Sequence, residues 1–284
     1  MKTTRTTTLL AIAAALALLS TTALAYYTQT VDGIEWTYTV SRDTASVGGG
    51  DYYGARAVST NTTGAIVIPS TLGGYPVRSI GHYAFYCCRG LTSVTIPDRV
   101  MCIGDGAFRD CSGLTRVTIP DSVTNIGAQA FYGCSGLTSV TIPDSVTSIR
   151  NYAFWECSGL TSVRISDSAT SIRNNAFQNC RGLTSMTIPD SVTRIEDAAF
   201  MGCSGLTSVA IPNSVTNIGM YAFSDCGGLT SVTIPDSVTS IGEDAFSGCS
   251  GLKTLHVPAG WKERTEMLDS ADVPEGCRIV YGTL

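Results

Sequence analysis

Apolar residues recur along this chain with a period of 23 residues. Three positions keep the period without slippage: a phenylalanine, a cysteine three residues later and a leucine three residues after the cysteine. The members of these ladders are Phe85, Phe108, Phe131, Phe154, Phe177, Phe200, Phe223 and Phe246; Cys88, Cys111, Cys134, Cys157, Cys180, Cys203, Cys226 and Cys249; and Leu91, Leu114, Leu137, Leu160, Leu183, Leu206, Leu229 and Leu252. Chance does not place three ladders in phase over so many copies, so the body of the chain is predicted to be a repeat structure.

Each copy reads A-F-x-x-C-x-x-L-x-x-V-x-I-P-D-S-V-x-x-I-G. Val and Ile two positions apart point to one face of a strand, so L-x-x-V-x-I predicts a strand that the proline ends. Asp-Ser suits a turn, and V-x-x-I-G predicts a second, shorter extended segment. The spacing of A-F-x-x-C-x-x-L is helical and predicts one or two helical turns on the opposite side. One copy cannot bury its apolar side chains alone, so the copies must stack into a continuous core.

The repeat resembles the BspA-like subclass of leucine-rich-repeat proteins. The motifs that carry the resemblance are A-F-x-x-C at 130–134, L-T-S-V-T-I-P at 137–143 and S-V-T-S-I-G at 237–242. The first unit, from residue 68, matches as well, with a five-residue insertion before Ile80. The resemblance covers about residues 26–284, and the period lies within the leucine-rich-repeat range of about 20–29 residues. It implies secreted or surface proteins that bind other proteins or host matrix.

The predicted fold is a β-rich α/β solenoid. The resemblance implies a right-handed horseshoe with a parallel β-sheet on the concave side, and the helical spacing places short helical turns on the convex side. Alternation within 34–40 and the apolar residues around Trp261 predict caps that cover the open ends. The predicted segments are a signal peptide at 1–25, an N-terminal β cap at 26–67, a solenoid of about eight repeats at 68–257 and a C-terminal cap at 258–284.

The N-terminus has the features of a secretory signal peptide. Lys2 and Arg5 precede an apolar run that ends at Leu19, and Ala23-Leu24-Ala25 matches the A-x-A cleavage pattern. The run is shorter than the roughly 20 residues of a spanning helix, and no later segment is long and apolar enough to cross a membrane. The protein is therefore expected to be secreted or held at the cell surface, without membrane insertion.

Composition narrows the classes of function. Only 14% of the residues are charged and the formal net charge is −5. Nucleic-acid binding is not expected, because affinity for the phosphate backbone comes from Lys and Arg. The two histidines, His82 and His256, lie many repeats apart, and no HExxH, GxSxG or Walker-type motif occurs. The sequence therefore predicts neither an enzyme nor a cofactor.

Two polar ladders invite a chemical interpretation. Stacked cysteines would have Cβ atoms about 4.8 Å apart, beyond the roughly 3.8 Å of a disulfide, so buried free thiols are predicted. A disulfide that involves Cys87, Cys102 or Cys277 stays open. The aspartates after proline could bind calcium, but calcium takes about six to eight oxygens and a turn cap is favoured. These residues are Asp98, Asp121, Asp144, Asp167, Asp190 and Asp236, with Asn213 breaking the row.

Several copies depart from the repeat and are expected to be locally looser or differently turned. Ser166 replaces the proline and Ala169 replaces the following Val. Arg150, Arg173 and Glu196 replace the glycine after Ile.

Two surfaces are candidates for binding. The outward strand positions are mostly Thr and Ser, interrupted by Arg116 and Arg164. The positions beside Phe vary most, and exposed Tyr and Trp are preferred at interaction hot spots; alternatively, these rings pack over their neighbours between coils. This aromatic stripe consists of Tyr86, Tyr132, Tyr152, Trp155 and Met201.

The sequence thus predicts a non-catalytic, secreted or cell-surface protein that mediates protein–protein interaction or adhesion, with a protein or extracellular matrix as partner. A glycan-binding or surface-layer-binding module that uses hydroxyls and rings is the alternative. Regular Thr arrays also occur in ice-binding proteins, a remote alternative that curvature and the Ser interruptions disfavour.

Overall fold

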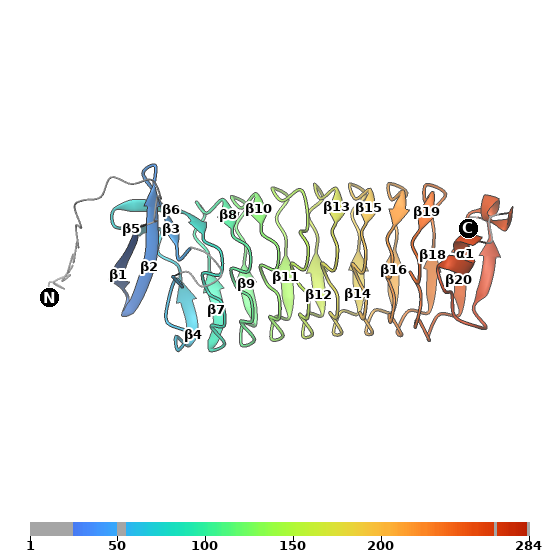
Figure 1. Cartoon of the computed structure of the whole chain (residues 1–284), viewed down its shortest axis with the longest axis horizontal. Coiled ribbons are helices and arrows are strands. Elements are labelled where there is room, and N and C mark those ends of the chain that lie inside the picture. The colour runs from blue at the N-terminus through green and yellow to red at the C-terminus, as the bar shows by residue number, and fades with distance from the viewer. Residues whose placement is uncertain (1–24, 50–54, 264–265, 283–284) are drawn as a thin grey trace, which may run out of the picture.

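The computed structural model describes residues 25–49, 55–263 and 266–282. Apart from Ala25, the predicted signal peptide lies outside the described residues. Within them the chain winds into a solenoid whose coils follow one another in a row, with strands β1 to β3 at one end and β21 at the other (Figure 1). Each repeat contributes one coil, and strands of consecutive coils pair in parallel.

The L-x-x-V-x-I segments form the first face of the solenoid, with one strand in each coil. These strands are β7 (Leu91–Thr95), β9 (Arg116–Thr118), β11 (Ser139–Thr141), β12 (Ser162–Arg164), β14 (Ser185–Thr187), β16 (Ser208–Ala210), β18 (Ser231–Thr233) and β20 (Thr254–Val257). The register advances by one repeat per strand, as in the pair Val140↔Val163. The V-x-I side chains point inward and the Thr and Ser between them face solvent, as the alternation predicted.

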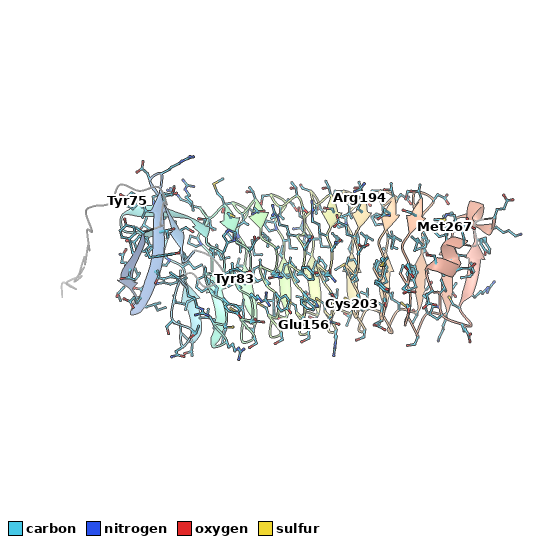
Figure 2. All side chains as sticks on the ribbon, viewed as in Figure 1. Tyr75, Tyr83, Glu156, Arg194, Cys203 and Met267 are labelled. Carbon is cyan, nitrogen blue, oxygen red and sulfur yellow. The ribbon has the colours of Figure 1, made fainter. Side chains whose placement is uncertain are left out.

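The V-x-x-I segments form the second face, also as predicted. Their strands are β8 (Cys102–Ile103), β10 (Asn125–Ile126), β13 (Ser171–Ile172), β15 (Arg194–Ile195), β17 (Asn217–Ile218) and β19 (Ser240–Ile241). Each is two residues long, and its isoleucine is buried while the residue before it faces outward. Figure 2 shows Arg194 at this edge of the coils and Glu156 at the opposite edge.

The core between the faces is a continuous stack of identical side chains. Neighbouring phenylalanine rings of the ladder lie nearly parallel, with centroids 4.9 to 5.6 Å apart. All eight rings are completely buried. Since each ring lies on its neighbours, no coil buries its phenylalanine without the next coil, which is the physical basis of the repeat.

The A-F-x-x-C segments contain no helix, so the predicted helical turns are wrong. Residues two before and two after each phenylalanine have left-handed φ angles, for example 58° at Tyr152 and 56° at Glu156. The Trp155 N–H donates within its own coil to the Tyr152 carbonyl, but the Phe154 N–H donates to the Ala176 carbonyl of the next coil. An α-helix needs consecutive right-handed residues whose N–H groups point along one axis. In this segment every second backbone N–H instead donates to a carbonyl of the next coil.

The left-handed position after phenylalanine allows a stability test at Glu156. Other copies carry glycine there, at Gly133, Gly202 and Gly248, and a left-handed φ costs an L-residue about 1 kcal/mol. We expect Glu156→Gly to be more stable than Glu156→Ala by about that amount, as measured by urea denaturation. As a control, Ala210→Gly on the exposed strand β16 should lower stability. If the alanine variant matches the glycine variant at Glu156, the left-handed assignment is wrong.

The cysteine ladder consists of buried free thiols. All eleven cysteines are unpaired, and the eight of the ladder are buried. From Cys111 onward, each thiol donates a hydrogen bond to the phenylalanine carbonyl of the preceding coil, as Cys157 does to Phe131 at 3.1 Å. Burial raises the pKa of these thiols, to about 11 at Cys88 and about 12 at Cys203.

Both ends carry additional elements. The N-terminal strands β1 (Tyr26–Val31), β2 (Ile34–Ser41) and β3 (Thr44–Val47) form an antiparallel meander, and β3 continues the second face through β6 (Tyr75–Ile80). The predicted insertion is a hairpin of β5 (Thr71–Leu72) and β6. Within the first face, β4 (Gly64–Val67) precedes β7.

The C-terminal end is closed by the only helical elements in the described part of the chain. A 3₁₀ turn, η1 (Ala259–Glu263), buries Trp261, and α1 (Glu266–Ser270) follows it. The last strand, β21 (Arg278–Tyr281), pairs in parallel with β20 and extends the first face by one strand. The cap is therefore part sheet and part helix, packed against the last coil.

Candidate binding surface

The first face is interrupted once along its length. Its strands pair from β4 to β12 and again from β14 to β21, but β12 and β14 are not joined by a strand ladder. The coil that follows β12 is the one in which Ser166 and Ala169 replace the proline and valine of the repeat. Val163, at the centre of β12, is only half-buried, whereas the equivalent residues of the neighbouring strands are buried. The smaller side chains of this coil coincide with looser packing between the two coils.

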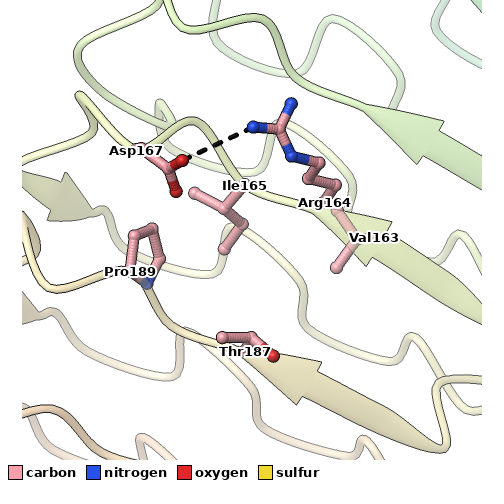
Figure 3. A pocket seen from close by; sticks show the side chains of 6 residues that line it. All are labelled: Val163, Arg164, Ile165, Asp167, Thr187 and Pro189. Atoms are coloured by element: carbon pink, nitrogen blue, oxygen red, sulfur yellow. Dashed lines mark hydrogen bonds and ion pairs between the residues drawn. The ribbon is translucent and has the colours of Figure 1, made fainter.

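A pocket of about 260 Å³ opens at this interruption. It lies where β12 ends, and its walls come from two consecutive coils (Figure 3). The lining residues are Val163, Arg164, Ile165, Asp167, Thr187 and Pro189.

Arg164 is the charged centre of this pocket. Its guanidinium lies 3.5 Å from an Asp167 carboxylate oxygen and 3.6 Å from Asp144 Oδ1 of the preceding coil. The Arg164 side chain and both carboxylates remain more than half exposed. Solvent-exposed ion pairs contribute little to stability, so this cluster leaves polar groups available for contact with another molecule.

Arg116 lies two coils away on the same exposed face. It stands on β9, in register with Ser93 on one side and Ser139 on the other. Arg116 makes no ion pair within the described residues. The two arginines predicted from the sequence therefore share one surface, separated by the hydroxyl-bearing residues of β11.

The rings of the aromatic stripe contact one another between coils. Tyr132 and Trp155 meet edge to face with centroids 4.4 Å apart, and Tyr152 lies 5.6 Å from Trp155. The sequence predicted this proximity. The Arg109 guanidinium stacks on the Tyr132 ring at 4.3 Å and bonds to Gln129. All three rings are half-buried, because their faces are already used by neighbouring side chains.

The other two members of the stripe lie apart from this cluster. Tyr86 stacks with Arg56, whose guanidinium is 5.4 Å from the ring, near the N-terminal cap. Met201 is half-buried, and its sulfur accepts a hydrogen bond from Gln178. The stripe is therefore three local clusters along the solenoid and not one continuous patch.

The aspartate ladder contributes to the turns. Asp144 Oδ1 accepts a hydrogen bond from the backbone N–H of Asp167 in the next coil at 3.1 Å. Within the described residues no group of three His, Cys, Asp or Glu side chains is arranged to hold a metal ion. His82 accepts a hydrogen bond from the Asp105 N–H in the next coil.

Sequence reasoning missed two parts of these sites. Asp144 and Asp167 were assigned only to the turns, although both contact Arg164. The contact of Arg109 with the Tyr132 ring was not predicted. The signal for the pocket was present in the chain, because the departures Ser166 and Ala169 follow directly after Arg164.

Parallel strands on two faces, coiled with a leucine in each turn, define a solenoid of the leucine-rich-repeat type. The model for the BspA type leucine rich repeat region matches residues 78–207 and 170–267. The chain belongs to this family. Among curated proteins, none matches the sequence.

Solved structures agree with this assignment. A leucine-rich repeat protein from Bacteroides ovatus ATCC 8483 is 29% identical, and the match covers 89% of this chain and 71% of that one with a TM-score of 0.62. The T. pallidum leucine rich repeat protein is 25% identical, with 88% of this chain and 97% of that one covered and a TM-score of 0.61. Within the described residues no helix has the length and apolar character needed to cross a membrane.

Proposed function

We propose that this protein is a non-catalytic interaction protein that binds a partner protein or extracellular matrix through the exposed side of the first face. The observation that carries the proposal is the pocket at Arg164, where the otherwise regular sheet is interrupted. Leucine-rich repeats typically mediate protein interactions. The signal-like features of residues 1–25 support export to the outside or the surface of the cell.

The chemistry of this surface favours a polar partner segment. Arg164 can donate in a bidentate manner to a carboxylate, and Asp144 and Asp167 can accept from amides or cations. The Thr and Ser side chains around them offer many weak hydrogen bonds, and Arg116 adds a second cation. Specificity would then come from the charged residues, since the hydroxyl positions differ little from coil to coil.

The aromatic cluster around Trp155 is the second candidate surface. The Trp155 Nε1 atom is buried without a hydrogen-bond partner in the described structure, so a partner that reached it would gain a bond. The glycan-binding alternative depends on this cluster, because sugars stack on exposed rings. Its rings are half-buried, however. The exposed side of the first face is therefore the preferred binding surface.

Binding to immobilised collagen, fibronectin and laminin, measured by surface plasmon resonance, tests the proposal. For a matrix protein that binds the native chain, we expect Arg164→Ala to weaken affinity about ten-fold or more, because a charge-assisted hydrogen bond is lost. Arg181→Ala removes an exposed charge outside this face and should leave affinity unchanged. If Arg164→Ala binds normally while Trp155→Ala does not, the partner uses the aromatic cluster and the first proposal is wrong.

A further inference from the structure

The second face contains two arginines where the repeat has glycine. The glycine after the buried isoleucine is tightly enclosed, since a Cβ added at Gly127 would lie 2.5 Å from the Asp105 backbone nitrogen and one added at Gly219 would lie 2.6 Å from that of Asp197. Real Cβ atoms do not approach backbone so closely. Arg150 and Arg173 occupy this position in consecutive coils. The Arg173 N–H still donates to the Ile149 carbonyl, as the Gly127 N–H does to Ile103, but within the described residues the Arg150 N–H makes no such bond to the preceding coil.

The second face is interrupted where these arginines occur. Its strands pair from β6 to β10 and from β13 to β19, and between them only the isolated bridge Ile149↔Ile172 remains. A pocket of about 260 Å³ opens there, lined by Ala128, Ser148, Arg150, Asn151 and Arg173. It is separate from the pocket at Arg164, which belongs to the first face.

The two guanidiniums are not neutralised by the protein. Both side chains are exposed, and neither makes an ion pair within the described residues. The Arg173 Nε–H donates to the Ser148 hydroxyl at 3.3 Å, which holds that guanidinium beside the pocket. Glu196 follows at the same position one coil further but forms no ion pair with Arg173. Like charges on adjacent coils repel each other, so an anion between them would be stabilised.

A backbone N–H in the same pocket has no acceptor, whereas in two other coils an aspartate carboxylate accepts the equivalent N–H. The Asp105 carboxylate accepts the Ala128 N–H at 2.8 Å, and Asp197 accepts the Met220 N–H at 2.9 Å. Ala128 occupies the same repeat position as these aspartates, one coil after Asp105, and its side chain has no carboxylate. The Asn151 N–H therefore donates to no acceptor in the described part of the chain.

We propose that this pocket binds a carboxylate group of an external ligand, in the place where the coils of Asp105 and Asp197 supply an aspartate carboxylate. The ligand carboxylate would accept from the Asn151 N–H and from the Arg150 and Arg173 guanidiniums, whose planar donors match its two oxygens. Two guanidiniums without ion pairs and one backbone N–H without an acceptor therefore lie around one pocket that suits an anionic group. This site lies on the opposite face from the proposed partner surface and does not depend on it.

Thermal shifts in sodium acetate, compared with sodium chloride at equal ionic strength, and anisotropy with dye-labelled polygalacturonate test the proposal. The key variant is Ala128→Asp, which supplies the repeat's own carboxylate to the Asn151 N–H and should fold at least as well as the native chain. We expect it to weaken polygalacturonate binding about ten-fold or more, because the ligand loses a donor and meets a like charge. Arg150→Gly with Arg173→Gly, which restores the repeat, should have the same effect.

Ser208→Asp adds the same charge to the first face and serves as the matched control. It should leave binding unchanged. If Ala128→Asp, the double glycine variant and Ser208→Asp all bind like the native chain, the site does not exist. A third outcome is that acetate stabilises the native chain but not Ala128→Asp, while polygalacturonate binds no more tightly than acetate per carboxylate group. The natural ligand is then a small carboxylate, and the assignment of the site stands.

Discussion

The protein is expected to be stable near pH 8 and to unfold cooperatively between about pH 9 and pH 11. Free thiols have a pKa of 9.0, and burial raises the pKa of every ladder cysteine, the least shifted being Cys88 at about 11. Below pH 9 the folded and unfolded chains hold the same thiol protons. Above it the unfolded chain releases protons that the folded chain retains, so the free energy of unfolding falls as pH rises.

The size of the effect follows from the number of thiols. Each thiol lowers the free energy of unfolding by about 1.4 kcal/mol per pH unit in this window. Eight thiols in one cooperative unit give on the order of 11 kcal/mol per unit, comparable with the whole stability of a typical domain. Urea denaturation at a series of pH values, under reducing conditions, measures the slope directly.

Alanine variants calibrate that slope. Cys180→Ala should reduce it by one proton, and Cys157→Ala combined with Cys180→Ala should reduce it by two, whatever the variants do to stability at pH 8. A stability that is constant from pH 8.5 to pH 10.5 would show that the thiols are ionised or oxidised in the folded protein. If the slope corresponds to fewer than eight protons, its value gives the number of coils that unfold in one transition, because each coil contributes one thiol.

Replacing Phe154 by alanine is expected to destabilise the protein by about 3–5 kcal/mol. Its ring is completely buried and lies between Phe131 and Phe177, with both centroids 5.3 Å away. The substitution opens a cavity and also removes two ring contacts, each worth about 0.5–1.5 kcal/mol. Because the site is in the middle of the solenoid, the loss weakens the coupling between the two halves. Urea denaturation followed by circular dichroism would show a lower midpoint.

The last ring of the ladder provides a matched comparison. Phe246 is equally buried but stacks on one ladder ring only, Phe223. Phe246→Ala should therefore cost less than Phe154→Ala, by about the 0.5–1.5 kcal/mol of one ring contact. Phe154→Leu should recover much of the lost stability, since it refills most of the volume. Equal costs at the two positions would mean that the stacking of rings contributes nothing beyond burial.

The ladders predicted the coil correctly because their residues have one environment in every copy. Strand positions, the second extended segment and the buried cysteines all follow from side chains that need the interior. The helical turns failed for a different reason. A spacing of three between Phe154 and Cys157 is shared by helices and by successive tight turns, and side-chain pattern alone does not say where backbone N–H groups bond.

The candidate sites were predicted only in part. Arg164 and Arg116 were recognised as breaks in a hydroxyl-bearing surface, and Tyr132, Tyr152 and Trp155 as neighbours. Their chemical settings needed the neighbouring coils. The carboxylates on Arg164 come from residues 144 and 167, and the guanidinium on Tyr132 comes from residue 109, so each contact involves a residue of an adjacent repeat or turn.

The sequence by itself determined that this chain is a stack of similar coils, because apolar side chains that recur every 23 residues can be buried only when the copies stack on one another. The tertiary structure decided which hydrogen bonds close each coil and where the stack opens. Both depend on the distance between the backbones of adjacent coils. Glycines such as Gly127 allow close backbone contact, and the strand ladder of the second face ends at β10, before the coil in which Arg150 replaces the glycine. Such a distance is a property of two coils together, and the residues of one coil do not contain it.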